Sequence, residues 1–405
     1  MSTSLLYHVF GIRGYVHMAT KFPKRKTVLF VVRQDDGELQ CSACGSYDVF
    51  RNGSATRRWR MPSCGCVLTF IQMKLHRVKC RQCGLARQVK VQFAHPRRQH
   101  TKQFEQYALA LSKLMTIQDV AKHLAVSWKT IKEIVKRDLA LRFKAPKLSD
   151  LKRIAIDEIC IGKGHRYLTI VMDLATGAVV FVGDGKRSDA LLPFWKRVKR
   201  ARASIQAVAI DMSPAYIKAV SENLPKARIV FDRFHIMKLM NEKLSGLRRV
   251  LHNELTGPLQ KKALKGTRWL LLKNPENLDS ARNEHERLAE ALRLNKPLAT
   301  AYYLKDELRL FWQQADKASA AAFLADWIAR AEISGVRMLI QFARTLRRHR
   351  WGLLSYYDYP ISTGPLEGTN NKIKTMQRQA YGYRDREFFI LKIYALHQAK
   401  YALVG

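Results

Sequence analysis

Two pairs of cysteines have the spacing of a zinc site. Cys41 and Cys44 form one Cys-x-x-Cys-Gly knuckle, and Cys80 and Cys83 form a second one farther along the chain. Zinc accepts four thiolate ligands in a tetrahedron, and two such pairs on facing turns supply them. A redox role is the weaker interpretation, because no thioredoxin-like βαβ pattern surrounds either pair. We therefore expect a structural zinc ion at these four cysteines.

The other three cysteines are weaker candidates. Cys64 and Cys66 lie between the knuckles and could compete for the metal, but we expect them to be small buried side chains on a hairpin. Cys160 follows an apolar run and is expected in a core. An odd total of seven cysteines, in a chain without the pattern of an export signal, argues against a disulfide framework.

Three carboxylates could together hold divalent cations. Asp157 and Asp211 each follow a short apolar run, where an acid is costly unless it caps a helix or binds a metal. Glu367 lies in the first turn of a helix that Pro365 is suited to begin. Each acid alone fits the cap of a helix, so the metal hypothesis depends on all three acting together.

The elements around these acids predict how they are positioned. Apolar runs bounded by Gly, Asp and Pro predict five strands, with helices over 189–202 and 214–223 on either side of the fourth. The predicted strands are Arg153–Ile159, Tyr167–Leu174, Val179–Gly183, Gln206–Asp211 and Ala227–Phe231. This order is typical of an α/β RNase H-like domain, whose acids lie on the first strand, after the fourth and on a later helix. A long helical insertion at about 240–350 would precede the last acid.

Such a triad predicts two magnesium ions, with manganese as a substitute. Carboxylates suit magnesium when the substrate is a phosphate ester, and two ions activate a water or a 3′-hydroxyl and stabilise the leaving oxygen. Asn371 and Lys374 follow Glu367 by four and seven residues and are expected on the same helix face, where they could hold a phosphate. A favourable acid at a helix N-terminus is the alternative for this segment.

Residues 116–138 have the pattern of a helix-turn-helix. Thr116 can cap a short helix, residues 125–126 form a turn, and Ser127 can cap a second helix. The second helix has an apolar face, and its basic residues are expected to face outward and contact DNA. These residues are Lys129, Lys132, Lys136 and Arg137. A generic helical hairpin with a solvated face is the alternative.

The composition supports a polyanionic partner. The 405 residues include 72 Lys and Arg against 33 Asp and Glu, a net charge of +39, and phosphate contacts by such a chain release counterions and add affinity. With 47% hydrophobic residues the chain is not a disordered basic tail, and no apolar run is long enough to span a membrane. We expect three domains: a zinc-ribbon domain over 1–95, a helix-turn-helix domain over 100–145 and an RNase H-like domain over 151–405.

Several motifs in combination resemble the DDE transposases of the ISL-three family of bacterial insertion sequences. The resemblance covers nearly the whole chain, including the cysteine knuckles and the helix-turn-helix. Its motifs are Ala155-Ile-Asp-Glu158, Ala209-Ile-Asp-Met-Ser-Pro-Ala-Tyr216, Val230-Phe-Asp-Arg-Phe-His235, Gly364-Pro-Leu-Glu-Gly-Thr-Asn-Asn-Lys372 and Ala380-Tyr-Gly-Tyr-Arg384.

The resemblance implies that Asp157, Asp211 and Glu367 are the catalytic triad. It implies cleavage at transposon ends and joining of the 3′-hydroxyl ends to target DNA, by a dimer or larger assembly that holds two ends of double-stranded DNA. It also implies a bacterial protein of the cytoplasm, associated with the nucleoid. Related transposases carry an Asp-x-x-His at Asp232 and His235, which implies a supporting role; Asp232 is also the main rival of Asp211 as second ligand.

Two other functions fit the same sequence. A DNA-binding regulator with an inactive RNase H-like domain would share the zinc ribbon and the helix-turn-helix, although the three intact acids argue against it. A metal-dependent nuclease without strand transfer would share the acids. The aromatic and basic residues of 377–384 could stack on a frayed DNA end or simply pack at the end of a helix.

Overall fold

The computed structural model describes residues 5–397, apart from positions 35, 163, 165, 187 and 255. Its contacts divide the chain into two compact units. The first comprises residues 1–144, 379–391 and 398–405, and the second comprises residues 145–378 and 392–397. The chain therefore leaves the first unit after residue 144 and returns to it at residue 379. Each unit is described by itself.

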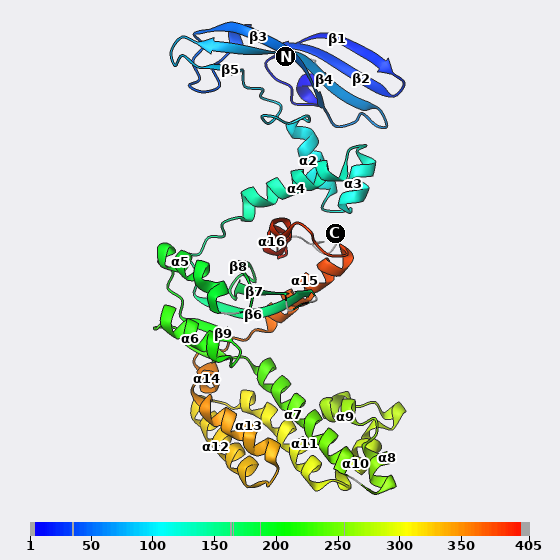
Figure 1. Cartoon of the computed structure of the whole chain (residues 1–405), viewed down its shortest axis with the longest axis vertical. Coiled ribbons are helices and arrows are strands. Elements are labelled where there is room, and N and C mark those ends of the chain that lie inside the picture. The colour runs from blue at the N-terminus through cyan, green and yellow to red at the C-terminus, as the bar shows by residue number, and fades with distance from the viewer. Residues whose placement is uncertain are drawn as a thin grey trace. The chain divides into compact units, whose positions relative to one another are not determined.

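A five-stranded sheet forms most of the first unit. Its order is β1-β2-β4-β3, β5 pairs with β4, and only β2 and β4 run parallel (Figure 1). The strands are β1 (Tyr15–Lys24), β2 (Thr27–Gln34), β3 (Val49–Arg60), β4 (Leu68–Cys80) and β5 (Ala86–Gln88), and the short helix α1 (Leu5–His8) precedes them. Alternate side chains of β4 are buried in a core around Trp59, so the sheet has one apolar face. Val49, which starts β3, lies opposite Cys80, which ends β4. This register brings the two cysteine knuckles together.

Three helices follow the sheet in the first unit. They are α2 (Lys102–Leu111), α3 (Ile117–His123) and α4 (Trp128–Phe143). Thr116 caps α3 by accepting a hydrogen bond from the amide of Asp119, and Ser127 caps α4 by accepting one from Thr130, which confirms both predicted caps. Ala125 has a φ of 52° in the tight turn between α3 and α4.

The last helix, α16 (Arg386–Ala395), begins in the first unit. The apolar pattern of residues 386–402 predicts a closing helix, and positions 398–402 lie outside the described residues. Among the described residues, no helix combines the length and apolar character needed to cross a membrane.

The second unit contains the predicted strands in the predicted order. The strands are β6 (Arg153–Gly162), β7 (Arg166–Asp173), β8 (Val179–Asp184), β9 (Ala207–Ile210) and β10 (Arg228–Phe231). The sheet order is β10-β9-β6-β7-β8; β6, β7 and β8 are antiparallel, whereas β6, β9 and β10 run parallel. Helices α5 (Leu192–Ala201) and α6 (Pro214–Asn223) flank β9 in the chain and pack on the sheet (Figure 1). Side chains on both faces of β9 are buried, as expected of an inner parallel strand.

A helical segment separates β10 from the final helices of this unit. It contains α7 (Arg233–Glu254), α8 (Pro258–Leu264), α9 (Arg268–Leu272), α10 (Glu284–Arg293), α11 (Lys296–Leu308), α12 (Lys317–Ile333), α13 (Arg337–Arg348) and α14 (Arg350–Leu354). Helix α15 (Gly364–Gln379) follows. The segment shares one hydrophobic core with the sheet. Gly352 packs directly on the Phe231 ring, so a larger side chain at this point of α14 would collide with β10.

Two expectations about cysteines are wrong. Cys64 and Cys66 are exposed, although they lie on a hairpin closed by hydrogen bonds between Cys64 and Val67. Cys160 is also exposed, because it occupies an outward position near the end of β6, past the residues that pair with β9.

Candidate active site

Three acids meet at one edge of the second sheet. Asp157 lies in β6, two residues beyond the last residue that pairs with β9, and Asp211 and Asp232 directly follow β9 and β10. Because these three strands are parallel, their carboxyl ends lie at the same edge, where ligands bind in open α/β sheets. The sequence pattern that placed Asp157 and Asp211 after apolar runs therefore placed them correctly in space.

Asp157 lies close to two other carboxylates at this edge, those of Asp211 and Asp232. Its Oδ2 accepts a hydrogen bond of 2.8 Å from Nδ2 of Asn370, and its Oδ1 lies 3.9 Å from Nε2 of His235. Burial raises the pKa of Asp157, and the neighbouring carboxylates of Asp211 and Asp232 raise it further. A bound cation would reduce the repulsion among these three carboxylates, so their arrangement fits a metal site.

Asp232 is engaged in the protein's own hydrogen bonds. Its side chain is 1% exposed; Oδ2 accepts from the amide and Nδ1 of His235, and Oδ1 accepts from the amide of Thr363. Burial opposes ionisation, but these bonds lower the pKa of Asp232. The bond to Asp232 in turn raises the pKa of His235, so an imidazolium is favoured between Asp232 and Asp157.

Asp211 is less occupied than Asp232. It is half-buried, and its Oδ1 accepts a hydrogen bond of 3.0 Å from the amide of Ser213 at the start of α6. No described residue donates a hydrogen bond to its Oδ2. Of the two rivals for the second metal ligand, Asp211 has the freer carboxylate.

Helix α15 approaches the same edge, but not through the residues the sequence suggested. Asn371 and Lys374 are exposed, whereas the neighbouring Asn370 is buried and binds Asp157. Glu367 is half-buried and lies one turn before Asn370, and residues three apart share a helix face. The structure thus leaves Asn371 and Lys374 turned to solvent, whereas Glu367 is half-buried one turn before Asn370 on α15.

Sequence reasoning missed four residues near this edge. Besides Asn370 and Thr363, they are Glu158, whose pKa is raised by burial and by Asp211, and Tyr216, which hydrogen-bonds Glu158. One signal was present: Asn370 interrupts the apolar stripe of α15, three residues before Ile373 and four after Leu366. A polar residue in a buried stripe needs a partner.

The carboxylates are close to one another without forming a closed cage. Among the described residues, the only group of three or more His, Cys, Asp or Glu whose ligand atoms all lie within 4.8 Å consists of Cys41, Cys44, Cys80 and Cys83. The Sγ atoms of Cys41 and Cys83, and those of Cys44 and Cys80, are 3.6 Å apart. A tetrahedron with Zn–S bonds of about 2.3 Å has edges of about 3.8 Å. The four sulfur atoms therefore fit zinc, and Cys64 and Cys66 are not part of the group.

Comparison with known proteins identifies the family. A transposase family model of the ISL3 DDE type matches residues 154–393. The chain is 32% identical over 400 residues to the transposase for insertion sequence element IS1001 of Bordetella parapertussis, with 98% of each chain covered. This chain belongs to the ISL3 family of DDE transposases. It is also 28% identical over 377 residues to the transposase for insertion sequence element IS1557 of Mycobacterium tuberculosis, covering 87% of this chain and 84% of that one.

Two further comparisons concern DNA binding and structure. The helix-turn-helix domain of transposase family ISL3 matches residues 89–139, which include α2 and α3 and most of α4. A solved structure of the Drosophila P element transposase strand transfer complex aligns with a TM-score of 0.37 at 12% identity, covering 74% of this chain and 92% of that one.

The basic residues of α4 in this transposase are not arranged as expected. Lys129 is exposed, but Lys132, Lys136 and Arg137 are half-buried in ion pairs. Lys132 Nζ lies 2.6 Å from Asp385 Oδ2, and Lys136 Nζ lies 3.0 Å from the same oxygen and 2.8 Å from Glu387 Oε2. Arg137 pairs with the buried Glu105. The expectation that all four face outward is wrong for three of them, because acids from residues 385–387 and from α2 cover them.

Proposed function

We propose that this transposase hydrolyses phosphodiester bonds at the ends of an insertion sequence and joins the resulting 3′-hydroxyl ends to target DNA. Asp157, Asp211 and Glu367 would hold two magnesium ions, with manganese as a substitute. Bound ions of this kind activate a water or a 3′-hydroxyl and stabilise the leaving oxygen. The family membership supports a transposase, and the proposal adds which three acids would hold the metal ions.

One observation carries the proposal: α15 is bound to the acidic edge of the sheet at two points. Asp232 accepts a hydrogen bond from Thr363, which immediately precedes α15, and Asn370 of α15 donates to Asp157. Glu367 lies between Thr363 and Asn370 in the sequence, on the segment of α15 that these two contacts hold against the sheet. This arrangement supports Glu367 as the third acid.

Asp232 and His235 act as positioning residues in this proposal. Both oxygens of Asp232 are occupied, so it fixes the start of α15 and the imidazole ring. His235 then presents a positive charge to Asp157, which partly offsets the repulsion among the carboxylates. Asp211, with one oxygen without a donor, is the better second ligand.

The proposal extends to the domain arrangement. The strand order and directions of the second sheet support an RNase H-like domain over 151–405 with a helical insertion at about 240–350. The four cysteines support a structural zinc ion within the zinc-ribbon domain over 1–95, and α3 and α4 support the helix-turn-helix over 100–145. Lys129 is exposed, while a DNA role for Lys132, Lys136 and Arg137 requires exchange of their acid partners. Two DNA ends must be held together for joining, so we propose a dimer or larger assembly in the DNA complex.

A cleavage and joining assay tests the chemistry. Full-length protein is mixed with labelled DNA that carries the ends of the encoding element, with Mg²⁺ or Mn²⁺, alongside Asp157→Asn, Asp211→Asn, Glu367→Gln and Asp232→Asn. We expect each of the first three to bind DNA but to lose at least about a thousandfold in rate, since each removes charge stabilisation at the transition state. Asp232→Asn is expected to retain measurable, reduced cleavage.

Other results of this assay would support a different second ligand or a different function. An active Asp211→Asn beside an inactive Asp232→Asn would make Asp232 the second ligand. Cleavage without joining would indicate a nuclease, and tight binding without cleavage under either metal would indicate a regulator.

A further inference from the structure

We propose that the helical segment binds an unpaired stretch of DNA strand in a groove along α7 that begins at the acidic edge. The proposal rests on the proposed function, because the groove serves a strand whose end is processed at Asp157. Two hollows make up the groove, with volumes of about 340 Å³ and 540 Å³. Both are lined by Phe234, Met237, Asn241 and Leu272, so they are neighbours along α7. Asp232 lines the first hollow, which connects the groove to the carboxylates.

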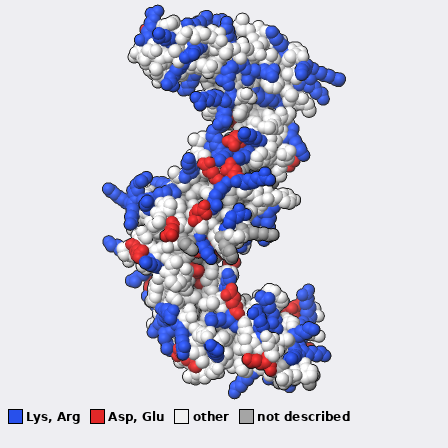
Figure 2. Space-filling model, viewed as in Figure 1, with Lys and Arg blue, Asp and Glu red and all other residues white. Residues whose placement is uncertain are grey.

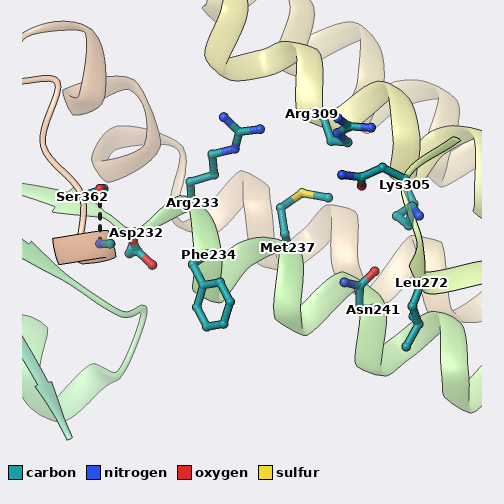
Figure 3. A pocket seen from close by; sticks show the side chains of 11 residues that line it. Asp232, Arg233, Phe234, Met237, Asn241, Leu272, Lys305, Arg309 and Ser362 are labelled. Carbon is teal, nitrogen blue, oxygen red and sulfur yellow. Dashed lines mark hydrogen bonds between the residues drawn. The ribbon is translucent and has the colours of Figure 1, made fainter. Parts of the chain in front are cut away.

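Basic residues line both hollows, together with Asp232 in the first and Glu242 in the second. Arg233 and Phe234 come from the start of α7, and Lys305 and Arg309 face them from α11 and the following turn, η5 (Arg309–Gln313), as Figure 3 shows. The second hollow adds further basic residues, Lys238, Arg249 and Arg268. Arg233, Lys238, Arg249 and Arg268 form no salt bridge with a described residue. Arg309, in contrast, is paired with Glu276 and Asp306. The four cations without acid partners are available to phosphates.

Lys305 gives the groove a buried positive charge. Its side chain is 1% exposed, and Nζ donates to the carbonyl oxygens of Leu271 and Lys273, at 3.0 and 3.1 Å. An ammonium has three N–H donors. Nζ also lies 4.9 Å from the centroid of the Tyr302 ring, and a phosphate oxygen in the first hollow could compete with that ring for the third donor. A buried lysine without a carboxylate partner is costly, which points to an anionic ligand.

The other lining groups suit a base. Phe234 is 44% exposed and offers a ring for stacking, and Oδ1 of Asn241 is a buried acceptor that no described residue satisfies. A base supplies both a flat face and an N–H donor, and base–aromatic stacking is a main source of single-strand affinity. Each hollow has the volume of a site for a drug-sized ligand, which suits a single nucleotide. An unpaired strand is therefore the occupant that satisfies the cations, the ring and the amide together.

Binding of a labelled oligothymidine of about 12 nucleotides to the full-length protein tests the groove, since single-strand sites span about 4–16 nucleotides. We expect Phe234→Ala to weaken binding about tenfold, through the loss of stacking. The double variant Arg249→Gln with Arg268→Gln should lower the slope of log K against log salt by about 1.4, because each phosphate contact contributes about 0.7. The matched control, Arg293→Gln with Arg344→Gln, removes the same charge from exposed positions on α10 and α13 that line neither hollow.

The two proposals fail separately. Equal losses in the groove variant and in the control, or unchanged binding in Phe234→Ala, would overturn the groove. Groove variants that lose oligothymidine binding while a duplex is still cleaved in an Asp157-dependent manner would support both proposals. Normal oligothymidine binding by wild-type protein that cleaves no end DNA would leave the groove standing and overturn the proposed chemistry.

Discussion

Helix α4 and the groove along α7 are both basic, but their positive charges are used differently. On α4, Lys132, Lys136 and Arg137 are paired with Asp385, Glu387 and Glu105. Along α7, Arg233 and Lys238 form no salt bridge with a described residue, and on the visible face of the molecule lysines and arginines predominate over acids (Figure 2). A count of lysines and arginines does not distinguish these regions. A paired cation must first lose its carboxylate before it can bind a phosphate, whereas an unpaired one exchanges only water and counterions.

The largest effect is expected from substitution of Glu105, whose ion pair with Arg137 should stabilise the fold around α4. Glu105 is 5% exposed, pairs with Arg137 and lies 3.5 Å and 3.4 Å from His95 and His100. Glu105→Gln should destabilise α2 and α4 by about 3 kcal/mol, because it leaves a partly buried Arg137 unpaired. Hydrogen exchange of the α4 amides measures this loss. Glu133→Gln, an exposed acid on the same helix, should change it by less than about 0.5 kcal/mol; a similar loss there would contradict a special role for Glu105.

Lys305 provides a pH test at the groove. Burial lowers its pKa to about 8, from 10.5, so the folded chain binds fewer protons than the unfolded chain between those pH values. The stability of α11 should therefore rise with pH from about 8 to 10.5, by at most about 3 kcal/mol. Hydrogen exchange corrected for its intrinsic pH dependence measures the change, and Lys305→Met should abolish it. A stability that falls over this range in wild type but not in Lys305→Met would contradict the assignment.

The acid partners of α4 can be removed without removing a cation. In Asp385→Asn with Glu387→Gln, Asn can still cap α16, where Asp385 accepts from the amide of Phe388, but Lys132 and Lys136 lose their partners. Duplex affinity should rise about tenfold, and its salt slope should steepen by about 1.8 if both lysines then bind phosphates. Anisotropy titrations over a salt series give both values.

A matched pair of substitutions separates this effect from net charge. Asp326→Asn with Glu332→Gln makes the same change in net charge, at acids that pair with Arg330 and Arg347 in the second unit. If this control variant gains as much duplex affinity, release of α4 is not the cause.

The smallest effect is expected at His235. Because Asp232 raises its pKa, the stability from this pair is fully present below the unfolded value of about 6.5 and is lost as pH rises through the folded pKa. The change should be on the order of 1 kcal/mol. Hydrogen exchange of the first α15 amides, corrected for intrinsic pH dependence, should show it in wild type and not in His235→Gln. The same pH dependence in His235→Gln would contradict this origin.

The sequence predicted local structure well where a local cause exists. The apolar runs of β6 to β10 are bounded by turn residues, and Thr116 and Ser127 accept hydrogen bonds from residues only three positions away. Asp157 and Asp211 could be placed at one sheet edge because parallel strands end together.

The sequence could not predict contacts between distant segments. The acid partners of Lys136 lie 249 and 251 residues away, and charge patterning on α4 alone made its basic face look solvated. The sequence pattern favours the exposed Asn371 in place of the buried Asn370 for a similar reason. Which side chains of α15 face the protein depends on which stripe of the helix is buried. The apolar neighbours Leu366 and Ile373 contained that information.

The distance along the chain between Lys136 and Asp385 also sets the time that passes between their synthesis on the ribosome. At synthesis rates of about 5–20 residues per second, the 249 residues between them take roughly 12–50 s to emerge. During that interval neither Asp385 nor Glu387 is present to pair with Lys132 and Lys136 of the nascent α4. A chain still on the ribosome is therefore expected to hold nucleic acid more tightly than the finished transposase, and completion of the last helix weakens its hold.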